Sequence, residues 1–212
     1  MNGYLVPYAC AESEFTEKRS RFISHIWRVE TEEEARAHIE EMKKKYYDAR
    51  HNCWCYLVRD GGAVRYSDDG EPQGTAGQPM LNVFQRQEVT NVCCVVTRYF
   101  GGVLLGAGGL TRAYTRGAKD ALDASGVSRM SLWTLWDVPC TYPLFERMKL
   151  EIEHCGGVLR DTEYGADIQI RAAFPENGAE AFAPRLRELS AGSLTMEPAG
   201  EEFLPGPREE PK

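Results

Sequence analysis

The chain has 212 residues and a formal net charge of −7, with 42% hydrophobic and 27% charged residues. This profile is typical of a globular protein, and the length suffices for one large domain or two small ones. No run approaches the roughly 20 apolar residues that span a bilayer, and residues 1–10 lack the basic and apolar regions of a secretion signal. We therefore expect a cytoplasmic protein without a membrane partner.

Charge is distributed unevenly along the chain. Basic and acidic residues balance up to residue 136, and the whole acidic excess lies in residues 137–212. A balanced domain can still gather its basic residues on one face, so the acidic pI does not exclude a nucleic-acid partner for the first part.

The seven cysteines favour reduced thiols, because an odd number does not form a closed disulfide framework. Cys53 and Cys55, like the adjacent Cys93 and Cys94, lack the usual separation of about two to four residues between paired zinc ligands. Both pairs lie in runs that indicate buried strands. We expect no metal and no cofactor.

The first part of the chain predicts mixed α and β structure. Strand-like runs at 4–9 and 22–29 flank a polar turn rich in Glu and Lys. Thr31 and Glu34 form a capping box that opens a helix up to about Lys45. Strands at 52–58 and 63–66 flank Asp60-Gly61-Gly62 as a hairpin.

Three further elements complete this part: a short helix at 80–87, a central strand at 92–99, and a helix from Leu110 that ends near Ser125-Gly126. Residues 127–136 form a strand or linker.

The second part follows a βαββαβ order that fits a ferredoxin-like fold. The expected elements are strands at 138–142, 158–164, 167–174 and 193–197, and helices at 144–155 and around 182–189. A proline-rich tail at 204–212 is expected to be disordered. The predicted domains are 1–130 and 131–203, in an α/β (α+β) two-domain protein.

A first glycine-rich segment, Asp68 to Pro79, leads into a helix whose free backbone N–H groups can hold an anion. Its carboxylates Asp68, Asp69 and Glu71 could bind a cation through oxygen ligands, although their order lacks the spacing of a calcium loop. The alternative is a tight turn capped by Asp.

A second segment, Arg98 to Arg116, places a glycine-rich loop between a buried strand and a helix N-terminus. It matches neither G-x-G-x-x-G nor a P-loop. Arg112, Arg116 and Lys119 share one helix face, and no acidic residue lies between Glu88 and Asp120. A phosphate-bearing or acidic partner would fit this charge, and a solvated basic face is the alternative.

Aromatic and titratable residues near these segments are weaker signals. Tyr99 and Phe100 could stack on bases or be buried. His51 could act as a base or be structural, and no Ser or Cys pairs with a histidine in sequence. Lys18, Arg19, Ser20 and Arg21 form a further polar cluster. No catalytic residue is assigned.

Four ordered motifs resemble the IMPACT family, bacterial YigZ type: residues 18–23, 48–53, 68–79 and 98–110. The resemblance implies an N-terminal domain of the ribosomal protein S5 domain 2-like fold and a ferredoxin-like second domain. It also implies a translation-associated partner, because eukaryotic relatives, which carry a different extra domain, contact a ribosome-associated activator of a stress-response kinase.

Three hypotheses remain open at this stage. One is a non-enzymatic module that contacts RNA, the ribosome or a translation factor. The others are an enzyme acting on a phosphorylated small molecule and a regulator that binds only protein. The candidate anion or RNA contacts are Lys18, Arg21, His51, Gly74, Thr75, Gly77, Arg98, Gly101, Gly102, Gly106, Gly108, Gly109, Arg112 and Arg116.

Overall fold

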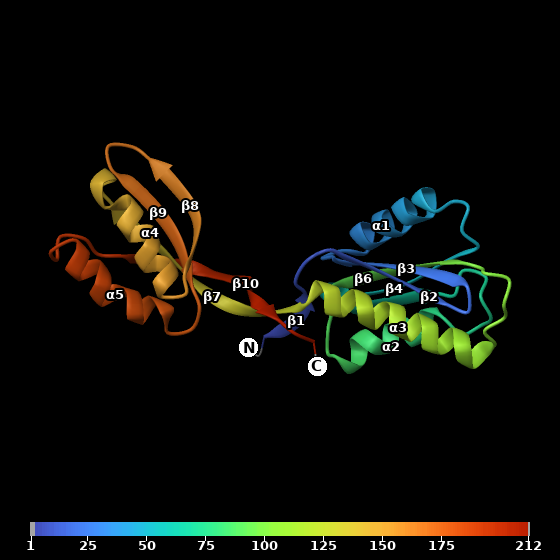
Figure 1. The fold of residues 1–212 in the computed structure, drawn as a ribbon. Coiled ribbons are helices and arrows are strands. Elements are labelled where there is room, and N and C mark those ends of the chain that lie inside the picture. Colours follow the sequence, from blue (N-terminus) through green and yellow to red (C-terminus); the bar gives the residue numbers. More distant parts are fainter. Residues whose placement is uncertain (1–2, 212) are drawn as a thin grey trace. The chain divides into compact units, whose positions relative to one another are not determined.

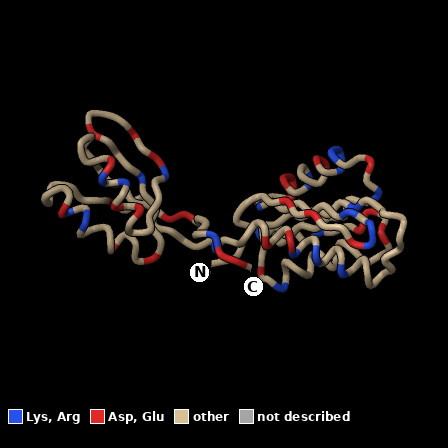
Figure 2. The backbone as a smooth tube through the Cα atoms, in the orientation of Figure 1, with Lys and Arg blue, Asp and Glu red and all other residues tan. Residues whose placement is uncertain are grey.

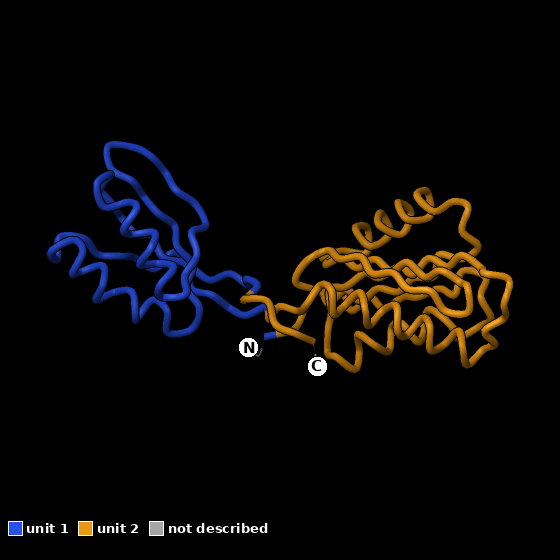
Figure 3. Tube along the Cα trace, viewed as in Figure 1, with its two compact units in different colours: residues 1–3, 130–205 blue, residues 4–129, 206–212 orange. Residues whose placement is uncertain are grey.

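A computed structural model describes residues 3–211 and divides the chain into two compact units. The N-terminal unit comprises residues 4–129 and 206–212, and the C-terminal unit comprises residues 1–3 and 130–205 (Figure 3).

The N-terminal unit is built on a five-stranded antiparallel sheet (Figure 1). Its strands, in spatial order, are β2 (Ala11–Glu17), β3 (Ser20–Arg28), β6 (Val92–Tyr99), β4 (His51–Val58) and β5 (Ala63–Ser67). The central strand predicted at 92–99 is confirmed. The predicted hairpin is β4 and β5, joined through the short 3₁₀ helix Asp60–Gly62.

Helices cover both faces of this sheet, as Figure 1 shows. Helix α1 (Glu32–Lys45) packs its apolar stripe on one face, where Cys93 and Val95 of β6 point. Helices α2 (Gly77–Arg86) and α3 (Ala107–Ser125) pack on the other face, against Cys94 and Val96. Because both faces of β6 are buried, its sequence is continuously apolar rather than alternating.

One half of the capping box of α1 is formed, and the other half is shifted by one residue. The Thr31 hydroxyl accepts a hydrogen bond from the Glu34 N–H at 3.2 Å. The Glu34 carboxylate in turn accepts one from the Glu30 N–H at 2.7 Å. The first bond satisfies an N–H group that the first helical turn leaves open, and the second ties the residue before the N-cap to the helix.

The prediction of a polar turn between the first two strand-like runs is wrong. Residues Ala11–Glu17 form β2, which pairs with β3 along its whole length. Phe15 is its one buried side chain, because β2 is an edge strand with little of its surface covered. Without a buried alternating face, the strand leaves no periodic signal in the sequence.

In the C-terminal unit the strands lie in the order β10-β7-β9-β8, which fits the predicted ferredoxin-like fold. Strand β1 (Tyr4–Pro7), which belongs to the N-terminal unit, also pairs with β7. Strand β7 (Val127–Cys140) runs without a break through the expected linker. The other elements are the 3₁₀ helix Tyr142–Leu144, α4 (Phe145–His154), β8 (Val158–Tyr164), β9 (Ile168–Phe174), α5 (Gly178–Leu189) and β10 (Glu197–Glu209). Met148, Ile152, Ile170 and Phe182 fill its core.

Two expectations at the end of the chain are wrong. The last strand is not 193–197, and the tail at 204–212 is not disordered up to Glu209, because β10 covers Glu197–Glu209. Prolines are tolerated in a strand that uses one edge for pairing. The Ser128 hydroxyl also donates to the Gly206 carbonyl at 2.8 Å.

Within residues 3–211, no helix is both long and apolar enough to cross a membrane.

Candidate functional site

The two glycine-rich segments line one pocket of about 370 Å³ in the N-terminal unit. We call it the larger pocket. Gly70, Glu71 and Pro72 come from the first segment. The second segment and the start of β4 contribute the rest of the lining: Arg50, His51, Arg98, Phe100, Leu104, Leu105, Gly106, Ala107 and Leu110.

A buried ion pair forms the polar floor of the larger pocket. Arg98 Nη1 donates to Glu71 Oε1 at 2.7 Å, and the Tyr114 hydroxyl donates to the same oxygen at 2.8 Å. Burial, together with the nearby Cys53 and Glu71, raises the pKa of Tyr114 well above its usual value. Tyr114 therefore stays protonated and acts as a donor.

The Arg98 guanidinium has donor capacity left over. Its Nη2 donates to the Ser20 hydroxyl at 3.3 Å, but its buried Nε has no hydrogen-bond partner among residues 3–211. Only 5% of the residue is exposed. An unpaired buried donor is costly, so this N–H would gain from any acceptor that reached it.

His51 has a fixed tautomer at the side of the floor. Its Nδ1 lies 2.8 Å from the carbonyl oxygen of Asp69. Because a carbonyl only accepts, Nδ1 carries the hydrogen, and in the neutral ring Nε2 is an acceptor. This Nε2 lies 3.9 Å from Glu71 Oε2.

The N-terminus of α3 borders the larger pocket and has no side-chain cap. Its N-cap is Gly106, at φ +74°, a backbone conformation that favours glycine. The first turn contains no acidic residue. The first N–H groups of the helix, including those of Gly108 and Gly109, therefore remain available to an external anion.

The N-terminus of α2 is different because it already holds an internal anion. The Asp68 carboxylate accepts hydrogen bonds from the N–H groups of Gly74, Ala76 and Gly77 at 2.8, 3.0 and 2.9 Å. The Thr75 hydroxyl donates to the Pro72 carbonyl. Three expected anion contacts, Gly74, Thr75 and Gly77, thus lie together, but their local donors already have partners.

The three candidate cation ligands, Asp68, Asp69 and Glu71, each accept hydrogen bonds from different donors. Asp69 Oδ2 accepts from the Asn52 N–H at 2.6 Å, whereas Asp68 caps α2 and Glu71 pairs with Arg98. A cation at these carboxylates would have to displace N–H donors. Over the described part of the chain, no three His, Cys, Asp or Glu side chains converge as a metal site would require.

A second, smaller pocket of about 240 Å³ gathers basic side chains. Lys18, Arg112 and Arg116 line it together with Leu105 and Gly109. Figure 2 marks the Lys and Arg positions along α3 and at the β2–β3 turn.

These basic residues differ in their partners. Arg116 pairs with Asp120 at 3.2 Å and covers the Phe15 ring at 4.3 Å. Arg112 forms no ion pair within residues 3–211 and is exposed. Its charge is therefore the freest of those on α3.

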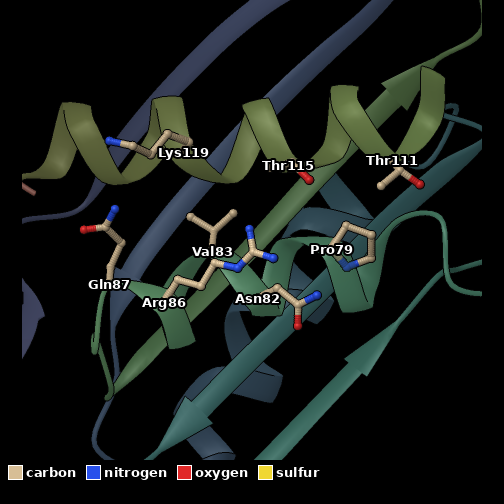
Figure 4. Close-up of a pocket in the computed structure, with 8 residues that line it drawn as sticks. All are labelled: Pro79, Asn82, Val83, Arg86, Gln87, Thr111, Thr115 and Lys119. Atoms are coloured by element: carbon tan, nitrogen blue, oxygen red, sulfur yellow. The ribbon is translucent and has the colours of Figure 1, made fainter. Parts of the chain in front are cut away.

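Arg112, Arg116 and Lys119 share one face of α3, but they do not line one pocket. Lys119 pairs with Asp123 and lines a different pocket, between α2 and α3, with Arg86 and Val83 (Figure 4). Seven residues turn a helix through about 700°, so Lys119 projects only about 20° away from Arg112, and its side chain lies on the α2 side of this shared face.

The β2–β3 turn presents Lys18 in a strained backbone. Lys18 and Arg19 both have positive φ, 47° and 65°, where Asn or Gly is usual. The Arg19 backbone packs on Gly101, where a Cβ would lie only 2.0 Å from the Arg19 carbonyl. Gly102, at φ +82°, continues this loop.

One expectation needs revision at this turn. Arg21 lines neither the larger nor the smaller pocket, because Glu14 holds its exposed guanidinium at 2.7 Å.

The sequence did not reveal Arg50 as a lining residue of the larger pocket or Tyr114 as part of its floor. Tyr114 resembled an ordinary member of an apolar helix face, and only the buried Glu71 beside it gives its hydroxyl a role.

Comparisons with known proteins cover both units. A family model of the Impact N-terminal domain matches residues 18–122, and a domain of unknown function, DUF1949, matches residues 138–193. IMPACT family member YvyE of Bacillus subtilis is 35% identical over 91% of this chain and 89% of its own length. IMPACT family member YigZ of Escherichia coli is 34% identical over 92% and 98%. A solved structure described as an hypothetical protein is 34% identical, with a TM-score of 0.59 and coverage of 92% and 97%.

Proposed function

Because the chain belongs to the IMPACT family, we propose that it is a cytoplasmic, non-enzymatic binding protein that contacts RNA, including RNA of the ribosome. The uncapped N-terminus of α3, beside Lys18, Arg112 and Arg116, is the observation that carries this proposal.

The physical reason is the match between this surface and a phosphate group. Free N–H groups at a helix N-terminus bind anions, and the helix dipole adds to the attraction. Arg112 keeps its charge unpaired, and the first turn of α3 has no acidic residue to compete. Such positive charge next to open donors supports contact with a phosphodiester backbone.

RNA is favoured over a translation factor because an exposed aromatic ring lies beside Arg50 and Arg98. Phe100 is 39% exposed and lines the larger pocket. Exposed aromatic rings next to basic grooves bind single-stranded nucleic acid by stacking.

The test is the affinity of the full chain for single-stranded RNA across a salt series. Replacing Arg112 and Arg116 by Ala should weaken binding and lower the salt slope by about two, one for each phosphate contact. The matched control replaces Arg36 and Arg65, exposed residues of α1 and β5, by Ala. Equal losses in both variants would overturn the proposal, as would binding without salt dependence. A protein captured instead of RNA would favour the translation-factor alternative.

His51 supports a second candidate function, an enzyme acting on a phosphorylated small molecule. The Asp69 carbonyl fixes its tautomer, so that Nε2 is an acceptor beside the larger pocket. An acceptor held in this way can serve as a general base. Thermal unfolding with a panel of nucleotides and sugar phosphates tests this function. A ligand at a hundredfold excess over Kd should stabilise the chain by about 2.7 kcal/mol, and no stabilisation by any of them would reject this candidate.

A further inference from the structure

The larger and smaller pockets share one wall. Leu105 lines both, with Gly106 and Leu110 on the side of the larger pocket and Gly109 on the side of the smaller one. A ligand that reaches over Leu105 can therefore occupy both pockets at once. The two halves differ in chemistry, which indicates what kind of ligand that is.

The larger pocket has apolar walls that are open to solvent. Leu104 is 83% exposed and Phe100 is 39% exposed, although both are apolar. The guanidinium groups of Arg98 and Arg50 lie 5.5 and 5.9 Å from the centre of the Phe100 ring. A partly exposed aromatic ring with guanidinium groups nearby is a surface on which a nucleobase can stack.

The floor below these walls offers both kinds of hydrogen-bonding group. Arg98 Nε is a buried donor without a partner among residues 3–211. His51 Nε2 is an acceptor when the ring is neutral, and Glu71 Oε2 lies 3.9 Å from it. The edge of a base carries donors and acceptors side by side, so it can satisfy this mixed set. A bare phosphate, which only accepts, cannot.

The smaller pocket is suited to the phosphate instead. Lys18, Arg112 and Arg116 line it, and Glu17 is its one acidic lining residue. Arg116 is held in place over the Phe15 ring. Three cations against one carboxylate leave a net positive charge, and the N–H of Gly109 lies in the first turn of α3.

We propose that the two pockets form one subsite for a nucleotide of single-stranded RNA. The unstacked base enters the larger pocket against Phe100, and its phosphate lies in the smaller pocket between Lys18, Arg112 and Arg116. This inference rests on the proposed RNA-binding function and adds that the protein contacts a base as well as the backbone.

The test combines a variant with a modified ligand. The full chain and its Phe100→Ala variant are titrated with a short oligoadenylate RNA and with an abasic ribose-phosphate strand of equal length and charge. Phe100→Ala should bind the RNA about tenfold more weakly, the size of one stacked base. It should bind the abasic strand as the unchanged protein does.

A control variant removes an exposed aromatic ring elsewhere. Tyr8→Ala is suitable because the Tyr8 N–H bonds to the Gly126 carbonyl, at the opposite end of α3. It should leave both affinities unchanged.

The outcomes separate this inference from the proposed function. If Phe100→Ala loses the same factor on both strands, or on neither, the base half of the subsite is rejected while RNA binding stands. If the unchanged protein binds neither strand, the proposed function itself fails. Circular dichroism of the Phe100→Ala variant confirms that a loss of affinity is not a loss of folding.

Discussion

Arg98 Nη1 lies 2.7 Å from Glu71 Oε1, and the two side chains expose only 6% and 3% of their surface. Arg98 is thus part of the folded core as well as of the pocket floor. Replacing it by Ala leaves the Glu71 charge buried without its guanidinium partner, although the Tyr114 hydroxyl still donates to it. We expect Arg98→Ala to destabilise the protein by about 3–5 kcal/mol, as measured by urea unfolding.

The control for this prediction removes both charges together. Because the cost arises from the charge left behind, the double variant Arg98→Met, Glu71→Gln should recover a large part of the stability. A double variant as unstable as Arg98→Ala would show that the attraction between Arg98 and Glu71 itself stabilises the fold. Binding assays should use Arg112 variants, since losses in Arg98 variants mix folding with recognition.

Asp68 should be important for stability although it is partly exposed. Its carboxylate accepts three N–H donors at the start of α2. Asp68→Ala should cost about 1–3 kcal/mol, read from the urea midpoint. Asp60→Ala, in the exposed hairpin turn, should cost far less.

Added anions and added cations both test the role of the Asp68 carboxylate. Sulfate should restore part of the stability of Asp68→Ala by taking the vacated place at the α2 N-terminus. Mg²⁺ or Ca²⁺ should leave the melting temperature of the unchanged protein where it is, because the carboxylate oxygens already accept N–H donors. A rise in melting temperature with either metal would support the cation hypothesis for Asp68, Asp69 and Glu71.

Substitutions in the turn at Lys18 and Arg19 should have opposite effects on stability and on RNA binding. Both residues have a left-handed backbone that costs about 1–2 kcal/mol each. Lys18→Asn with Arg19→Gly should relieve this strain and raise the melting temperature. The same change removes two charges beside the smaller pocket and should weaken RNA binding.

A second pair of substitutions separates strain from charge at this turn. Lys18→Gln with Arg19→Gln keeps the strain and removes the charges, so it should weaken binding without raising the melting temperature. Should the Asn-Gly turn bind RNA as tightly as the unchanged protein, the turn has no part in recognition.

His25 should make the fold sensitive to mild acid. Burial under α1 lowers its pKa from 6.5, although the nearby Glu12 acts in the opposite direction. Glu41 and Lys45 of α1 face it as well. Since the folded pKa lies below the unfolded one, the neutral ring contributes stability above about pH 6.5. That contribution is lost as the pH falls through the folded pKa.

Urea midpoints measured across this pH range check the prediction. His25→Gln should flatten the decline below about pH 6.5. His38→Gln, which alters a more exposed ring on α1, serves as the comparison. An unchanged pH profile in His25→Gln would assign the decline to other groups.

Much of the fold follows from local signals that the sequence displays. The capping box at Thr31 and the apolar run of β6 need no knowledge of the rest of the chain. The two glycine-rich segments could also be identified, because glycines between a buried strand and a helix are distinctive.

Other features depend on partners far away in sequence. Strand β2 is polar and becomes a strand only through its pairing with β3. The orientation of Lys119 depends on where α2 packs. The Arg98–Glu71 pair joins residues that look like surface charges, and only burial turns them into the floor of a pocket. The strain at Lys18 and Arg19 carries no sequence signature, since neither residue favours such a turn.

Arg208 in β10 donates to the carbonyls of Asp123 and Ser125, in the last turn of α3, at 3.3 and 3.4 Å. Arg208, the side chain that caps this helix, therefore lies 83 residues after Ser125 in the sequence. While the chain is being synthesised, α3 emerges with its last carbonyls open, and they gain this partner only when β10 has been translated. The helix that we assign to the ligand is thus completed late in synthesis, after both units have been made.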